Sequence, residues 1–159
     1  MRLAGGIRDT EFLLLGHPQR VGLHPFTFMS ANPINNERLF ADAAIEHWRQ
    51  LGQDLKADVE RFNQVGGSAS FSESSEGEYR VSNSGTGLEV RISADPYDHI
   101  ARYEFFRTND NSAGAPEGGI LSMRMAGGGG VEFFSADETV TADAARKLLL
   151  DPVLNPETT

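Results

Sequence analysis

The chain has 159 residues, of which 39% are hydrophobic and 23% charged, values typical of a folded soluble domain rather than a disordered one. It contains no cysteine, which excludes disulfides, thiolate metal sites and cysteine nucleophiles. Its formal net charge of −9 argues against nucleic acid and anionic membranes as partners, because both are bound through basic surfaces. Its longest apolar run covers only residues 12–15, far short of the ~20 that span a bilayer. We therefore expect a cytoplasmic protein of bacterial type.

Residues 1–28 differ in character from the rest of the chain. They carry two of the four histidines, two prolines and no sustained hydrophobic periodicity, and Met29 follows them directly. We interpret residues 1–28 as an irregular arm or a spurious N-terminal extension, and residues 29–159 as a single domain. The alternative is that residues 11–15 form an edge strand.

A long amphipathic helix is predicted over residues 36–64. Its apolar positions are three or four residues apart, which places them on one helix face. They are Ala44, Trp48, Leu51, Leu55, Val59 and Phe62. Asn35 or Asn36 is the expected N-cap, and Gly66 and Gly67 are expected to end the helix.

Strand patterns occupy the chain from residue 68 to residue 135. A weak serine-rich strand begins at Phe71, and clearer alternation follows over residues 78–82, 88–92, 100–108, 120–126 and 131–135. A second helix is predicted over residues 142–150, with Thr141 as its N-cap and Pro152 beyond its end. Arg146 and Lys147 are placed in its last turn.

The order and the short connections of these elements predict the fold. Short connections favour hairpins, and strands segregated from helices favour an α+β domain of two layers. We expect a long N-terminal amphipathic helix packed on a 5–6-stranded antiparallel meander sheet, followed by a short C-terminal helix. The helix is expected to cover one sheet face and leave the other freer.

The outer face of the predicted sheet is the candidate interface. Alternation places arginines, isoleucines and phenylalanines on it, and a mixed apolar and arginine face is typical of a docking surface. The candidate residues are Arg91, Ile100, Arg102, Phe106, Ile120, Arg124 and Phe134. The alternative is that the terminal helix or residues 1–28 cover these side chains.

No catalytic, cofactor-binding or metal-binding motif stands out. The chain has no Gly-x-Ser-x-Gly string, and His47 lacks the second histidine that a metalloprotease helix needs. The glycine runs lead into strands rather than helices, which is typical of hairpin turns and not of phosphate loops. Asp95, Asp98 and His99 could hold a divalent ion, but turn chemistry explains them better. We expect no cofactor.

Three functional hypotheses follow. The first is a non-enzymatic protein-interaction module of the adaptor, chaperone or inhibitor type, which binds a protein partner or a second copy through the outer sheet face. The second is an enzyme or small-molecule-binding domain with a pocket between helix and sheet, for which Tyr79, Tyr103 and Arg102 are the available polar residues. The third is a single-strand nucleic-acid binder that uses Phe106, Phe134 and the outer arginines. The first is favoured, and the charge makes the third the weakest.

Overall fold

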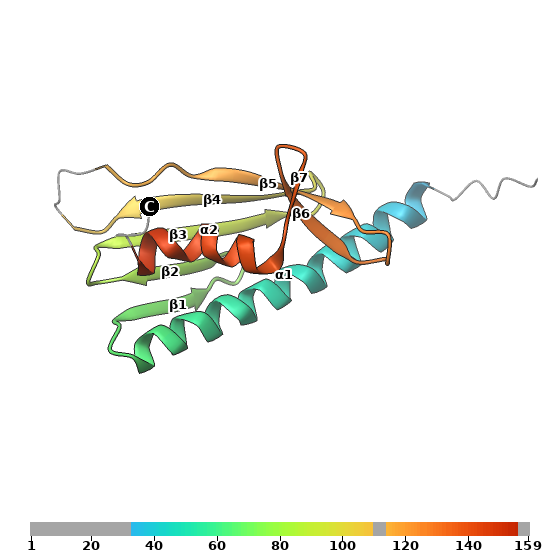
Figure 1. The fold of residues 1–159 in the computed structure, drawn as a ribbon. Helices are drawn as coiled ribbons and strands as arrows, with labels where there is room; N and C mark the ends of the chain where they lie inside the picture. The colour runs from blue at the N-terminus through green and yellow to red at the C-terminus, as the bar shows by residue number, and fades with distance from the viewer. Residues whose placement is uncertain (1–32, 110–113, 156–159) are drawn as a thin grey trace, which may run out of the picture. The chain divides into compact units, whose positions relative to one another are not determined.

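A computed structural model describes residues 33–109 and 114–155 as two helices and seven strands (Figure 1). The elements are α1 (Pro33–Gln64), β1 (Ala69–Glu73), β2 (Tyr79–Asn83), β3 (Leu88–Asp95), β4 (Ile100–Arg107), β5 (Gly119–Met125), β6 (Val131–Ser135), β7 (Glu138–Val140) and α2 (Ala142–Leu154). All of them belong to the unit Ala31–Thr159. The hypotheses about residues 1–28 lie outside the described residues.

The seven strands form one antiparallel sheet in the order β1-β2-β3-β4-β5-β6-β7. The predicted meander is confirmed, with seven strands rather than five or six. The additional strand is β7, which pairs with the end of β6 through Phe133 and Val140. A strand of three residues is too short to show alternation, so its sequence gave no periodic signal.

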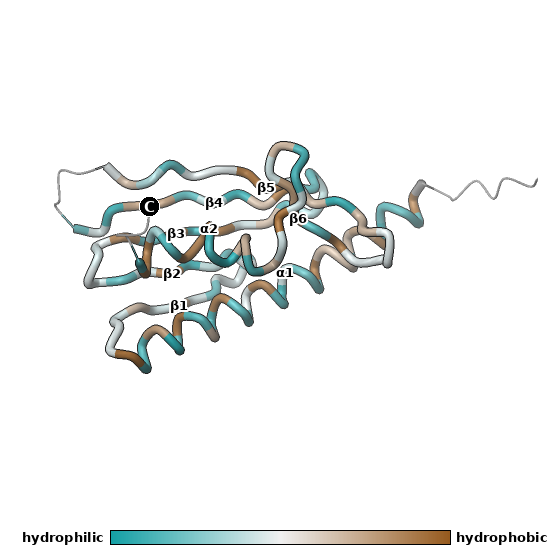
Figure 2. The backbone as a smooth tube through the Cα atoms, in the orientation of Figure 1, coloured by the Kyte–Doolittle hydropathy of each residue, from teal (hydrophilic) through white to brown (hydrophobic). Residues whose placement is uncertain are grey.

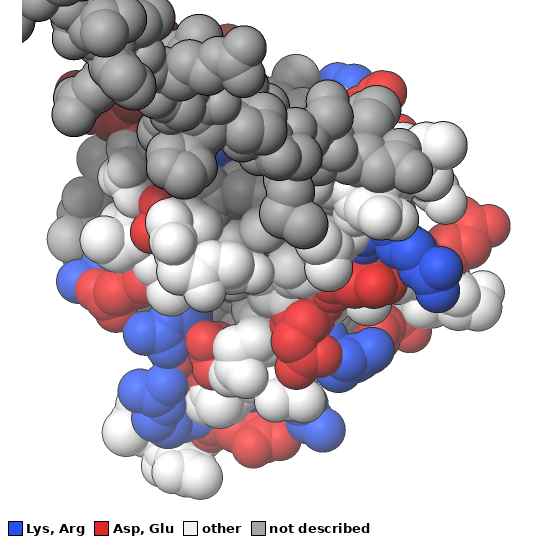
Figure 3. All heavy atoms as spheres, turned by 90° about the vertical axis from the view of Figure 1, so that its right-hand side faces the viewer, with Lys and Arg blue, Asp and Glu red and all other residues white. Residues whose placement is uncertain are grey.

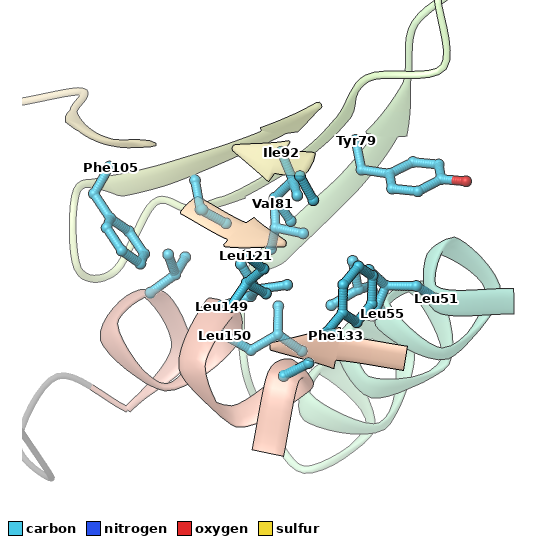
Figure 4. Packing of buried hydrophobic residues seen from close by; sticks show 14 of the residues in the cluster. Leu51, Leu55, Tyr79, Val81, Ile92, Phe105, Leu121, Phe133, Leu149 and Leu150 are labelled. Atoms are coloured by element: carbon cyan, nitrogen blue, oxygen red, sulfur yellow. The ribbon is translucent and has the colours of Figure 1, made fainter. Parts of the chain in front are cut away.

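Both helices pack on the same face of the sheet, which makes the α+β domain two layers deep. In Figure 4, side chains from α1, α2 and the strands meet in one cluster between the layers. Leu55 of α1, Leu149 of α2 and Phe133 of β6 are each at most 1% exposed. Helix α2 packs on β2 and β3 and also contacts α1. The predicted alternation of buried and outward residues therefore holds along the central strands.

Helix α1 begins three residues earlier than predicted. Pro33 is its first residue, so Asn35 and Asn36 lie inside the helix and the expected N-cap is wrong. Proline suits a first helical position, because its missing N–H would have no partner there. The C-terminal prediction is confirmed: Gly66 has a φ of +97°, and Gly67 N–H donates to the Phe62 carbonyl at 3.0 Å. Figure 2 shows hydrophobic and hydrophilic residues alternating along α1.

The middle of α1 sits directly on Tyr79 of β2. A Cβ atom added to Gly52 would lie 2.3 Å from Cζ of Tyr79, so no larger residue fits while the ring stays in place. The Tyr79 hydroxyl donates to the Trp48 carbonyl at 3.1 Å, and the Trp48 and Tyr79 rings stack at 4.9 Å. The Trp48 indole N–H donates in turn to the Gly77 carbonyl at 2.9 Å. Glycine at position 52 thus permits the close approach of helix and sheet.

Helix α2 runs to Leu154, past the predicted end at residue 150. Pro152 lies inside its last turn, and Arg146 and Lys147 are therefore not in that turn. Burial explains the extension, because Val153 is 0% exposed within the core. The Val153 carbonyl also accepts bonds from the Asn83 side-chain amide and the Thr86 hydroxyl, each at 3.0 Å. Tertiary contacts outweigh the local cost of the proline.

The edge strand β1 is tied to the end of α1. The Asn63 side-chain amide donates to the Ala69 carbonyl and accepts from the Ala69 N–H, both at 2.8 Å. One side chain thereby satisfies two backbone groups at the edge of the sheet, where no further strand is paired in the described part. Such coverage limits strand addition at this edge.

The contact at Gly52 gives a stability prediction. At a solvent-exposed position inside a helix, replacing glycine by alanine stabilises the protein by about 1 kcal/mol. We expect Gly52→Ala to destabilise instead, by about 1–3 kcal/mol, because the added methyl overpacks Tyr79. Urea unfolding monitored by circular dichroism measures the change, with Gln53→Ala as the exposed neighbouring control. The same substitution in a Tyr79→Leu background should lose most of its penalty, and a Gly52→Ala variant more stable than the native chain would contradict the packing argument.

His47 gives a pH prediction. Its ring lies 4.8 Å from the Phe133 ring, and burial lowers its pKa from 6.5, a shift that Glu132 partly opposes. The unfolded chain therefore binds this proton more readily, so the contribution of His47 to the free energy of unfolding is constant above about pH 6.5 and decreases as the pH drops toward the folded pKa. When the pH is lowered from about 7.5 to about 5, the free energy of unfolding of the His47→Gln variant should fall by less than that of the native chain. Equal losses would show that His47 titrates normally.

Candidate functional site

The seven candidate interface residues all lie on the sheet face opposite the helices. Arg91 lies between the buried Val90 and Ile92 on β3, and each other candidate is likewise next to a core residue in its strand. Ile120 is 52% exposed and the two phenylalanines are half-buried. Within residues 33–109 and 114–155, no helix packs on this face, because α2 lies beside α1 on the other one. We call this sheet face, with all of its outward strand positions, the outer face.

The strand register divides the candidates into two groups. Ile100 lies opposite Ser122, which lies opposite Phe134, and Arg102 lies opposite Ile120. This group, with Arg124, gathers over β4, β5 and β6. Phe106 lies opposite Glu89, at the far end of β4 from Ile100, which is about 20 Å along the strand. The register therefore brings together five of the seven candidates and leaves Phe106 and Arg91 as a separate pair.

Each outer phenylalanine is covered by an arginine. The guanidinium carbon of Arg91 lies 4.3 Å from the Phe106 ring centroid, and that of Arg124 lies 4.5 Å from the Phe134 centroid. Cation–π stacking of this kind is worth about 0.5–1 kcal/mol at exposed positions. The arrangement explains how aromatic rings remain on an outward sheet face. Each ring and its arginine therefore form one stacked unit on the surface.

Carboxylates hold these arginines in place. Arg91 donates to Glu89 at 2.7 Å, and this hydrogen bond raises the pKa of Arg91. Arg124 pairs with Asp137 at 2.8 Å. Arg102 forms no ion pair with any described residue, and it is exposed. Arg102 is thus a cation of the outer face that is available to a partner.

Positive and negative charges on the outer face are equal in number. Its outward strand positions carry four arginines and four acidic residues, although the whole chain carries −9. They are Arg80, Arg91, Arg102, Arg124, Glu89, Asp95, Glu104 and Glu132. This face is therefore less acidic than the chain as a whole.

A cavity of about 160 Å³ lies between α1 and two turns of the sheet. Its lining includes Ile45 and Trp48 from α1, Glu76 and Gly77 from the β1–β2 turn, Pro96 from the β3–β4 turn, and Met123 from β5. The sequence analysis considers a pocket between helix and sheet, but the residues that it names for that pocket are not those that line this cavity. The available signal was Ile45, an apolar residue beside the core stripe of α1 that is 48% exposed.

A second, open groove of about 480 Å³ lies near the start of α1. His99 is at its side, with a φ of +55°, a ring stacked 3.9 Å from that of Phe40, and a hydrogen bond of 3.0 Å to Glu37. Asp95 accepts the N–H groups of Tyr97 and Asp98, as a turn residue does. In the described residues, no group of three His, Asp or Glu is arranged to hold a metal ion.

The polar residues named for the pocket hypothesis do not line either space. Tyr79 is buried under α1, and Tyr103 is half-buried with its hydroxyl near Gly119. Burial raises the pKa of both phenols, so both are neutral donors at ordinary pH. Arg102 points to the outer face. The cavity beside Trp48 is therefore lined by residues other than those that the sequence suggested.

Figure 3 looks onto the end of the molecule at which α1 begins. Where described residues are visible, basic and acidic side chains are interspersed rather than gathered into areas of one sign. Neither described helix combines the length and the apolar character that crossing a membrane requires. Comparisons with protein-family models, curated proteins and solved structures found no match to this chain.

Proposed function

We propose that this protein is an interaction module of the adaptor, chaperone or inhibitor type, and that its outer face binds a second copy of the chain. The observation that carries the proposal is that the helices cover only one of the two sheet faces. Two helices close one face, and no described element packs on the other, although it holds two phenylalanines and two isoleucines. Apolar side chains in such a position favour association.

Charge supports a second copy as the partner. Two chains of net charge −9 repel each other over most approaches. The outer face is the exception, because its four arginines and four acidic residues cancel. In a two-fold arrangement each patch meets its own copy, so arginine can lie opposite glutamate in both directions. Arg102, which pairs with no described residue, provides a cation for such a contact.

The size of the outer face suits this assignment. Strands about 4.8 Å apart make a seven-stranded sheet about 30 Å wide, and strands of this length reach about 20 Å. The flat area is roughly 600 Å² before side-chain relief is added. A standard interface buries about 800 Å² of accessible surface on each partner. A sheet-to-sheet dimer would fit these dimensions and would leave both helical layers outside for further partners.

The outer phenylalanines provide the test. Light scattering after size exclusion of the full chain should give a dimer at low and at high salt, because salt does not screen the apolar contacts of the outer phenylalanines and isoleucines. Phe106→Ser with Phe134→Ser should leave the circular dichroism spectrum unchanged and weaken dimerisation at least tenfold, which corresponds to about 1.4 kcal/mol.

The control is Leu39→Ser with Leu148→Ser, which removes exposed apolar residues from the helices and should leave the dimer intact. A monomeric native chain at concentrations of about 100 μM, well above the Kd of a typical specific dimer, would contradict the proposal. So would a dimer that the two phenylalanine substitutions leave unchanged. Loss of the dimer in the helical control instead would place the interface on the helices.

A further inference from the structure

The cavity beside Trp48 has one kind of polar group on its walls. Ile45, Pro96 and Met123 make it largely apolar, and Glu76 is the only charged side chain among the described residues that line it. The indole N–H of Trp48 is already used, since it donates to the Gly77 carbonyl at 2.9 Å. The described residues therefore present a carboxylate and an indole to the cavity, but no free side-chain donor that an anion would need.

Glu76 is the unusual member of this wall. It forms no ion pair with a described residue, whereas the nearby Glu78 pairs with Arg80. Only its backbone is held, through a bond from its N–H to the Ser74 hydroxyl at 3.3 Å. The carboxylate is thus available to a cation from solution, and the net charge of −9 raises the local concentration of cations.

Trp48 fixes the other side of the cavity. Its ring stacks on Tyr79 with an angle of 17° between the planes, and its hydrogen bond to Gly77 favours this orientation. A preorganised indole with a carboxylate nearby is the pairing that attracts alkylammonium groups, because the face of the ring and the carboxylate both favour positive charge. Size agrees: the volume of about 160 Å³ compares with the ~150 Å³ that accommodates one benzene-sized molecule.

We propose that this cavity is a binding site for a small organic cation, an alkylammonium ion with an apolar body. The apolar part lies against Ile45 and Met123, and the charge lies between Trp48 and Glu76. The site is on the helix side of the sheet. It does not depend on the outer face, and its test does not depend on the oligomeric state.

Trp48 itself reports the binding, because it is the only tryptophan in the chain. Choline is titrated into the full chain against sodium chloride at equal ionic strength, and 3,3-dimethyl-1-butanol serves as the uncharged ligand of the same shape. We expect choline to give a saturable change in Trp48 emission, with at least about tenfold weaker binding of the alcohol. Equal binding of the two compounds, or no saturable response to choline, would overturn the proposal.

Two variants locate the charge. Glu76→Gln should weaken choline binding about fivefold or more, because the carboxylate is the cation's partner. Glu73→Gln is the matched control, a neighbouring exposed carboxylate that does not line the cavity, and it should bind as the native chain does. Unchanged binding in Glu76→Gln would show that the carboxylate is not part of the site. Equal weakening in both variants would show that only the general charge of the protein attracts choline.

Discussion

The contact between Tyr79 and the backbone of α1 is the constraint on which the rest of the domain depends. The ring fills the space that a side chain at position 52 would occupy, and its hydroxyl bonds the Trp48 carbonyl. A helix of 32 residues is longer than any of the strands, so one close contact near its middle sets its position over the sheet. From that point, Leu51, Leu55 and Val59 meet the core, and Trp48 is placed at the sheet end beside the cavity.

The position of α1 leaves room for α2 on the same sheet face. Arg146 of α2 pairs with Asp58 of α1 at 3.1 Å, and Val153 is bonded by Asn83 beneath it. Asn83 is the only buried polar or charged residue among the described ones, and both ends of its amide are satisfied. With both helices on one side, the arginine-covered phenylalanines are left on the other. The two faces therefore have distinct roles in the proposed function, one for folding and one for association.

Much of this fold was predictable because its signals are periodic. Val90 and Ile92 alternate with Glu89 and Arg91, and such alternation determines both the strand and its faces. The misses have physical reasons. β7 is too short for a period, and α2 continues through Pro152 because burial of Val153 outweighs local propensity. Glycine at position 52 reads as a weak point in a helix until Tyr79, 27 residues away, is placed against it.

The two candidate sites differ in how much of each could be predicted from the sequence. Outward strand positions follow from parity, so Arg91 and Phe134 were placed on the correct face from sequence. The stacking of Arg91 on Phe106 and of Arg124 on Phe134 depends on side-chain geometry that alternation does not contain. The cavity at Trp48 joins a helix with turns about 30 and 50 residues further along the chain, a juxtaposition that comes only from tertiary packing.

Trp48 and Tyr79 hold α1 to the sheet, so that helix and sheet unfold as one cooperative unit. Urea unfolding of the native chain, followed simultaneously by Trp48 fluorescence and by far-ultraviolet circular dichroism, tests it most directly. The account predicts coincident transitions with the same midpoint, since the helix cannot leave Tyr79 without opening the core. A Trp48 transition at clearly lower urea, with the secondary structure still intact, would show that this contact is peripheral and would contradict the account.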